Sequence, residues 1–166
     1  GAAGIMFPFV NSAAEAERAV QFMKYPPQGT RGVAGIIRAT DYGRQWDRYF
    51  CEANDRSLVI AQIETRTAVE AADQIAAVEG VDVLFVGPLD LSVSLGCPGD
   101  FTPPDFVAAL EKVIAACQTH CKTAGILSRP QLAGEHKRLG FRFFALGSDS
   151  GSVVSGLQQS LTTILT

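Results

Sequence analysis

The chain of 166 residues is 47% hydrophobic and 19% charged, which fits one compact globular domain and excludes a disordered chain. Its formal net charge is -3 and it has no run of Lys and Arg, so it lacks the basic footprint of a nucleic-acid-binding protein. The longest apolar runs, such as residues 81–86 with Asp82 inside, are far shorter than the roughly 20 apolar residues of a membrane span. We therefore expect neither nucleic acid nor a membrane among the partners.

The N-terminal residues and the cysteines predict a cytoplasmic protein. Residues 1–10 contain no basic segment and no small-residue cleavage site follows them, so no signal peptide is expected. Cys51, Cys97, Cys117 and Cys121 lie in apolar or helical patterns, which favours reduced thiols over a disulfide scaffold. Cys117 and Cys121 are one helical turn apart but offer only two ligands, where a structural zinc site needs four.

Strands and helices are predicted to alternate along the first half of the chain. The apolar run at residues 5–10 indicates a buried strand, and Ser12 with Glu15 forms a capping box that begins a helix. Thr65 is the expected cap of a later helix. The elements expected in this half are strands at residues 5–10 and 58–63 and helices at residues 12–25, 41–54 and 65–79.

The same alternation is predicted to continue to the end of the chain. Thr102 and Pro103 indicate the start of a long helix, because Thr caps a helix and Pro fits its first position. The other elements expected here are strands at residues 81–86, 124–127 and 141–146 and helices at residues 90–95, 130–139 and 152–165. The buried face of the long helix is expected to comprise Phe106, Val107, Leu110, Val113, Ile114, Cys117 and Cys121.

Five strand–helix units in sequence predict a parallel α/β architecture. Strands that are apolar on both faces agree with this, since helices cover both sides of most parallel sheets. The pattern is compatible with a small doubly wound sheet and equally with five consecutive units of an eight-stranded barrel. It does not decide between them.

Two acidic residues stand at the ends of neighbouring predicted strands. Glu64 directly follows the strand at residues 58–63, and Asp90 follows the next strand after a short turn. Both are expected on the C-terminal rim of a parallel sheet, where such folds build their active sites. Two converging carboxylates repel each other unless a cation lies between them, so the pair favours a divalent metal with oxygen ligands. The alternative is that both are first-turn or cap acids of helices, stabilised by the helix dipole.

Other candidate residues lie near these two acids. Gln62 is expected to point the same way as Glu64, two residues along the strand. Gly87-Pro88 is expected to present backbone N–H groups to an anion at a helix start. His120 and His136 are expected on the surface, since both lie on predicted helices among polar neighbours. The sequence contains neither a P-loop nor a nucleophile elbow.

Several motifs together resemble the HpcH/HpaI aldolase family, which also contains macrophomate synthase. The resemblance covers essentially the whole chain, in order and at the right spacings. The motifs are Phe7-Pro8-Phe9-Val10, Ala14-Glu15-Ala16, residues 25–32 (YPPQGTRG), Gln62-Ile63-Glu64-Thr65, residues 78–82 (VEGVD), residues 85–92 (FVGPLDLS), Gly125-Ile126-Leu127 and residues 145–149 (ALGSD).

The resemblance implies a parallel (β/α)8 TIM barrel, of which residues 1–166 form a single domain holding the C-terminal five β/α units. It implies a usually oligomeric carbon–carbon lyase that makes or cleaves a bond through the enolate of a 2-keto acid such as pyruvate, with an aldehyde as the other reactant. A divalent metal, Mg²⁺, Mn²⁺ or Co²⁺, acts in this family as the Lewis acid.

The resemblance also assigns roles to seven residues. Glu64 and Asp90 match the metal ligands of the family. Gln62 matches a polar residue near metal and substrate, and Leu127 a residue that lines the pocket. The turn whose backbone holds the keto-acid carboxylate is matched by Gly87, Pro88 and Leu89.

Two departures from the family pattern bear on function. The three strands that precede this region in the family carry its essential Arg and catalytic His, and no segment of this chain matches them, so we expect the chain to be part of a longer enzyme. Leu89 stands where the family often has a smaller residue, and is expected either to narrow the pocket or to pack outward. The competing functions are a truncated, non-catalytic relative that binds metal or keto acid, and a lyase acting on CoA thioesters.

Overall fold

The computed structural model describes residues 1–165, which alternate between strands and helices as the sequence predicts. All five predicted strands are present; β2 has the predicted bounds, and the ends of the others differ by at most three residues. The elements are β1 (Gly4–Phe7), α1 (Ala13–Met23), the 3-10 helix η1 (Arg38–Thr40), α2 (Trp46–Arg56), β2 (Leu58–Ile63), α3 (Arg66–Glu70), α4 (Ala72–Ala76), β3 (Val83–Val86), α5 (Pro88–Ser94), α6 (Pro104–Thr119), β4 (Thr123–Ser128), α7 (Ala133–Leu139), β5 (Phe143–Leu146) and α8 (Asp149–Leu165).

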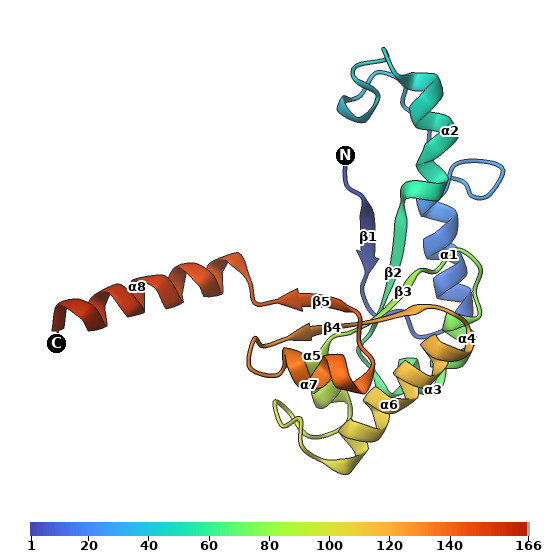
Figure 1. The fold of residues 1–166 in the computed structure, drawn as a ribbon. Coiled ribbons are helices and arrows are strands. Elements are labelled where there is room, and N and C mark those ends of the chain that lie inside the picture. The colour runs from blue at the N-terminus through green and yellow to red at the C-terminus, as the bar shows by residue number, and fades with distance from the viewer. Residues whose placement is uncertain (166) are drawn as a thin grey trace.

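The five strands form one parallel sheet in the order β1-β2-β3-β4-β5, so each strand pairs with the next in the sequence. A doubly wound sheet instead reverses its strand order at a switch point. Figure 1 shows the strands side by side, with α1, α4 and α6 lying against one face of the sheet. The order and the curl identify a parallel half-barrel, which decides between the two architectures that the sequence left open.

The two faces of the sheet are packed very differently. The large core cluster lies between the strands and the helices and includes Ile63, Leu84 and Ile126, none more than 1% exposed. Burying each such side chain stabilises the fold by about 1.5–3 kcal/mol. A small second cluster, formed by Ile60, Val83 and Phe85, lies on the opposite, concave face. Alternate residues of each strand therefore face the interior of the curl.

The predicted helix at residues 41–54 is wrong in its first turn. Asp41, Tyr42 and Gly43 all have positive φ angles, of 48°, 53° and 94°, which a right-handed helix does not contain. They form turns after η1, and the helix begins at Trp46. The buried hydroxyl of Thr40 holds this segment, since it accepts from the Gly43 N–H at 3.1 Å and donates to Gly35 O at 2.7 Å.

Two other predicted helices differ from the observed ones. The helix at residues 65–79 is divided at Ala71 into α3 and α4, although Thr65 caps it as predicted through a 3.0 Å bond from the Ala68 N–H. The long helix begins one residue later than expected, with Pro103 as its N-cap. It ends at Thr119, so Cys121 lies beyond it with a φ of 54° and is exposed rather than buried. Val107 is also partly exposed, at 37%.

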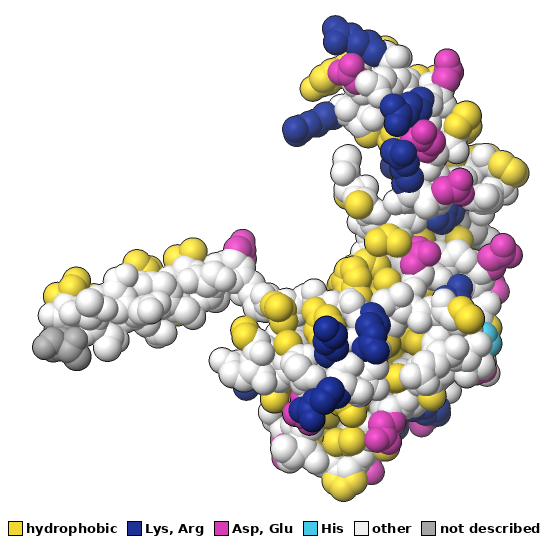
Figure 2. Space-filling model, viewed as in Figure 1, with side chains coloured by type: hydrophobic (Ala, Val, Ile, Leu, Met, Phe, Trp, Pro, Cys, Tyr) yellow, Lys and Arg dark blue, Asp and Glu magenta, His cyan; other side chains and the backbone are white. Residues whose placement is uncertain are grey.

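Helix α8 leaves the end of β5 and projects away from the rest of the molecule (Figure 1). It begins at Asp149, three residues before the predicted start. Figure 2 shows hydrophobic side chains along this helix, unlike the mainly polar surface expected of a helix in solvent. Those more than half exposed are Val153, Val154, Leu157, Leu161 and Ile164. Within the described residues, no helix is long and apolar enough to cross a membrane.

Candidate metal centre

Glu64 lies at the C-terminal end of β2 with its carboxylate buried. Its side chain is only 5% exposed, and Oε2 accepts a hydrogen bond of 3.1 Å from the backbone N–H of Phe9, which follows β1. Thr65, not Glu64, is the N-cap of α3. The alternative that Glu64 merely caps a helix is therefore wrong.

Asp90 is the third residue of α5 and is exposed, so it is a first-turn acid of that helix, as the alternative expected. Asp90 also lies close enough to Glu64 for its charge to affect the pKa of the Glu64 carboxyl. Burial raises the pKa of the Glu64 carboxyl, the hydrogen bond from Phe9 opposes this, and the negative charge of Asp90 raises the pKa further. The charges of the two predicted carboxylates therefore interact.

Gly87 provides the space that the Glu64 carboxylate occupies. A Cβ added at Gly87 would stand 2.6 Å from Glu64 Oε1, closer than real Cβ contacts allow. The two residues lie at the ends of neighbouring strands, and the Gly87 N–H donates to Ile63 O at 3.4 Å. The absence of a side chain at this position therefore lets the carboxylate lie directly over the backbone of the next strand.

The turn after β3 begins α5 with Gly87 as N-cap and Pro88 as the first helical residue. The first intrahelical hydrogen bond runs from the Leu91 N–H to Gly87 O at 3.0 Å. The N–H groups of Leu89 and Asp90 precede that bond, in the turn where helical N–H groups have no intrahelical acceptor. This backbone can donate to an anion, as the sequence predicted for the Gly87-Pro88 turn.

Gln62 and Leu127 both point to the concave face of the sheet. Gln62 pairs with Phe85 of the concave cluster and is half-buried, two residues before Glu64. Leu127 pairs with Ala145, which packs against the same cluster, and is 44% exposed. The alternation along the strands therefore orients both residues to the concave face, which for Gln62 is the orientation that the sequence predicted.

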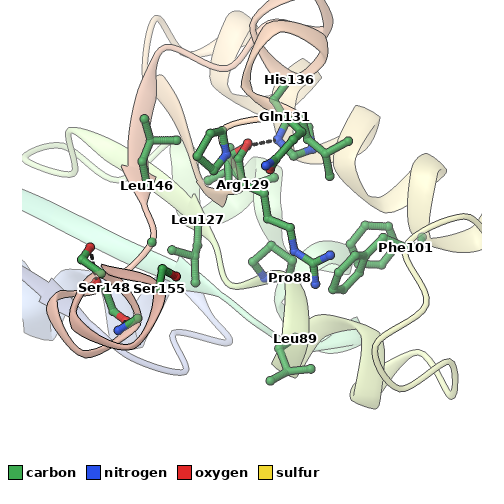
Figure 3. Close-up of a pocket in the computed structure, with 18 residues that line it drawn as sticks. Pro88, Leu89, Phe101, Leu127, Arg129, Gln131, His136, Leu146, Ser148 and Ser155 are labelled. Atoms are coloured by element: carbon green, nitrogen blue, oxygen red, sulfur yellow. Dashed lines mark hydrogen bonds between the residues drawn. The ribbon is translucent and has the colours of Figure 1, made fainter. Parts of the chain in front are cut away.

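A hollow of about 850 Å³ lies beside this turn, and we call it the rim hollow. It is enclosed by Pro88 and Leu89, by Phe101 and Phe106, by residues 126–132 and by segments of residues 146–155 (Figure 3). Leu89 is 59% exposed and is one of the residues at the edge of the hollow. The walls include Leu127 but not Gln62, Glu64, Gly87 or Asp90.

His136 is only partly at the surface, where the sequence predicted it. Its ring is half-buried in the wall of the rim hollow, and Nδ1 lies 2.8 Å from the hydroxyl of Ser128, which is 4% exposed. Burial lowers the pKa of His136. Arg129, which was not among the predicted site residues, directly follows the end of β4 as Glu64 follows the end of β2. Its position after a strand was therefore a signal present in the sequence.

The remaining histidine contacts an acidic side chain, and the four cysteines differ in their burial. His120 Nε2 lies 2.8 Å from Asp73 Oδ1, in a contact at the surface. All four cysteines are free, and burial raises the pKa of the Cys117 thiol to about 11. Among residues 1–165, no three His, Cys, Asp or Glu side chains come together as a metal site, so the candidate centre has two protein carboxylates.

Comparison with known proteins gives the same family from sequence and from structure. The chain is 41% identical over 165 residues to the 2-dehydro-3,6-dideoxy-6-sulfogluconate aldolase of Pseudomonas putida, covering 99% of this chain and 64% of that protein. It is 40% identical over 169 residues to the hydroxypyruvate/pyruvate aldolase of Paraburkholderia phytofirmans, covering 99% of this chain and 65% of that protein. The chain thus spans just under two thirds of the length of these curated relatives.

A solved HpcH/HpaI aldolase/citrate lyase family protein from Burkholderia cenocepacia superposes on the whole chain. The TM-score is 0.93 at 35% identity, and the match covers 66% of that protein. The sequence profile of the family described as HpcH/HpaI aldolase/citrate lyase matches residues 1–156. This chain therefore belongs to the HpcH/HpaI aldolase/citrate lyase family.

Proposed function

We propose that this chain carries the metal and keto-acid half of the active site of a divalent-metal-dependent aldolase. The observation that carries the proposal is the buried carboxylate of Glu64, which accepts a hydrogen bond from the Phe9 N–H. Its burial and the negative charge of Asp90 both raise the pKa of this group. A carboxylate that is costly to ionise alone is stabilised by a cation next to it. Its place on the C-terminal rim of parallel strands is where barrels bind substrates.

The residues present fit a hard divalent cation. Glu64 and Asp90 supply oxygen ligands from neighbouring strand ends, which suit Mg²⁺, Mn²⁺ or Co²⁺ and leave positions for water and substrate oxygens. The absence of a side chain at Gly87 leaves room for the Glu64 carboxylate in this position. When bound, the ion supplies a Lewis acid for the keto oxygen on which negative charge develops.

The surrounding residues would bind and orient the 2-keto acid. The N–H groups of Leu89 and Asp90, in the first turn of α5, are donors for its carboxylate. The amide of Gln62 lies on the same face as Glu64, where it can hold a water or a substrate oxygen. Leu89 and Leu127 line the adjacent rim hollow and reduce the access of water to the reacting carbon.

We propose that residues 1–166 are one domain, the C-terminal five units of a (β/α)8 barrel. Support comes from the sequential parallel half-barrel and from the length of the relatives, of which this chain spans just under two thirds. The remaining strands would close the sheet between β5 and β1 and cover its concave face. They would also supply the Arg and the His that the family resemblance implies for acid–base chemistry.

We propose further that the protein is a homo-oligomer in the cytoplasm. The apolar side chains of Val153, Leu157 and Leu161 repeat on one side of α8, which projects away from the other helices and strands of the described residues. A second copy of the chain is the occupant that this stripe fits, since exposed apolar patches of this kind mark interfaces. Four free thiols support a reducing compartment.

The substrates would be a 2-keto acid and an aldehyde. The names of the two relatives, a sulfogluconate-type aldolase and a hydroxypyruvate/pyruvate aldolase, share the aldolase reaction and differ in the substrate. The alternative function is a non-catalytic relative that binds metal and keto acid. The presence of both carboxylates, Glu64 and Asp90, together with the glycine at position 87, favours an enzyme over this non-catalytic alternative.

The test is carbon–carbon bond formation from pyruvate and glycolaldehyde with Mn²⁺, followed by NMR, in the longer enzyme that we propose joins this chain to the segment with the Arg and the His. We expect product in the wild type, none with EDTA, and none in Glu64→Gln or Asp90→Asn. Metal-dependent binding of pyruvate without any product would favour the non-catalytic alternative. Product formation that survives both substitutions would contradict the proposed site.

A further inference from the structure

The rim hollow contains one permanent charge that the proposed chemistry does not use. Its lining residues include Arg129 but neither Asp nor Glu. The rest of the wall is apolar or carries hydroxyl groups, and Ser148 and Ser155 lie across the space from Arg129 (Figure 3). Arg129 is therefore the permanently charged side chain of the described lining, and a mainly apolar wall strengthens the attraction between that charge and an anion.

Among the residues that the structure describes, no acidic side chain forms an ion pair with the guanidinium of Arg129. The ion pairs found within the described residues 1–165 join other residues. The contact of Arg129 is with the ring of Phe101, whose centroid lies 5.8 Å from the guanidinium carbon. Stacking on a ring leaves the edges of the guanidinium fork, which match a carboxylate or phosphate in two-point geometry, available for a ligand.

The backbone that carries Arg129 is fixed although its side chain is exposed. The buried hydroxyl of Ser128 donates to Arg129 O at 3.2 Å and is paired with His136 Nδ1 at 2.8 Å. Figure 3 shows the Arg129 side chain running from this anchor past Pro88 toward Phe101. The cation is therefore directed to the side of the hollow that adjoins the start of α5, where the keto-acid carboxylate is proposed to bind.

We propose that the rim hollow binds a second anionic group at the far end of the substrate, with Arg129 as the residue that recognises it. This inference rests on the proposed function and makes it more specific: the preferred substrates are 2-keto acids with a distal carboxylate, sulfonate or phosphate. Such a ligand joins two sites, since its keto-acid end lies at Glu64 and Asp90 and its anionic end reaches Arg129. Arg129 is a specificity-determining residue rather than a catalytic one.

The test compares ligands that differ only in the distal charge. Binding of 2-oxoglutarate and 2-oxoadipate is measured by calorimetry with Mn²⁺ present, each against the keto acid of equal length that ends in a methyl group, 2-oxopentanoate and 2-oxohexanoate. We expect the dicarboxylate to bind about tenfold more tightly in at least one pair, as a hydrogen bond to a charged group implies. The ratio of the two affinities, dicarboxylate over methyl-ended keto acid, should fall to about one in Arg129→Gln. It should be partly retained in Arg129→Lys, which keeps the positive charge but not the two-point hydrogen bonding of the guanidinium.

Arg138→Gln is the matched control, since Arg138 is an exposed arginine of the adjacent helix α7 that contacts its own helix at Gly134 O and lies outside the hollow. Its ratio should equal that of the wild type. Equal binding of the charged and methyl-ended ligands, or a preference that Arg129→Gln leaves intact, overturns the inference alone. Failure of all four ligands to bind with Mn²⁺ contradicts the proposed function and this inference with it.

Discussion

Gly87 and Glu64 meet at the ends of two neighbouring strands so closely that any side chain at position 87 would displace the carboxylate, since its Cβ would lie 2.6 Å from Glu64 Oε1. The other oxygen of the carboxylate is held by the Phe9 N–H. The carboxylate is thus enclosed between two backbone segments. Its geometry depends on a residue that carries no functional group of its own.

Substitution Gly87→Ala should weaken metal binding without unfolding the protein. The methyl group must push Glu64 off its rotamer, at a cost of about 0.5–1.5 kcal/mol, which is up to about tenfold in affinity. Mn²⁺ titration by calorimetry measures the change. Gly134→Ala is the control, because a Cβ there meets nothing within 4 Å. Unchanged Mn²⁺ affinity in Gly87→Ala would show that the ion does not contact Glu64.

Stability should fall on mild acidification because of His136. Burial lowers its pKa in the folded chain below the ordinary value of 6.5, so the unfolded chain binds the proton more readily. The contribution to stability is therefore present above pH 6.5 and is lost as the pH falls below it. The free energy of unfolding, measured with urea between pH 7.5 and 5.5, should show this loss. The loss should be smaller in His136→Gln and unchanged in His120→Gln. If His136→Gln and the wild type lose stability equally on acidification, His136 is not the cause of the loss.

The four thiols should react with a disulfide reagent at different rates. Cys51 and Cys121 are exposed and should react first, Cys97 is intermediate, and Cys117 is 1% exposed with a pKa raised to about 11. Because the thiolate is the reactive form, Cys117 should react only on unfolding. A time course at pH 8 with and without denaturant measures this. Four fast thiols in the native protein would mean that the core around α6 is not packed as described.

Assembly should depend on the apolar stripe of α8. Replacing Leu157 and Leu161, 61% and 59% exposed, by Glu should dissociate the oligomer, because buried charges at an interface remain unpaired. Light scattering after size exclusion measures the mass. Gln158→Glu, which adds one charge at an exposed polar position of the same helix, should leave the mass unchanged. A monomeric wild type, or a mass that the two Leu substitutions do not alter, would contradict the proposed interface.

The periodicity of the sequence was sufficient to predict the strands and the rim position of Glu64. Strand ends depend on local apolar runs, and the C-terminal rim follows from parallel pairing alone. The start of α2 was not predictable, because the turn with the left-handed residues Asp41 and Tyr42 is stabilised by Thr40, a contact set by the fold.

The environment of side chains was harder to predict than the elements. His136 was expected at the surface because its neighbours in sequence are polar, whereas the hydroxyl of Ser128, eight residues earlier, draws it into the wall of the rim hollow. The bond from Phe9 to Glu64 joins residues 55 apart and uses a backbone group, so no residue type signals it. The apolar stripe of α8 is helical in period, but the sequence does not say that the helix leaves the body.

The measurement that tests the central claim most directly is calorimetric titration of the chain with Mn²⁺ and then with pyruvate or oxalate. The wild type should bind the keto acid only after the metal. Glu64→Gln and Asp90→Asn should each weaken metal binding by more than about 100-fold, because mutating a group that only orients a metal ligand already lowers metal affinity by about 10–100-fold. Asp105→Asn, which removes a first-turn acid of α6, should bind as the wild type does. Metal-independent binding of the keto acid, or full Mn²⁺ affinity in either carboxylate variant, would contradict the assignment of Glu64 and Asp90 as the metal centre.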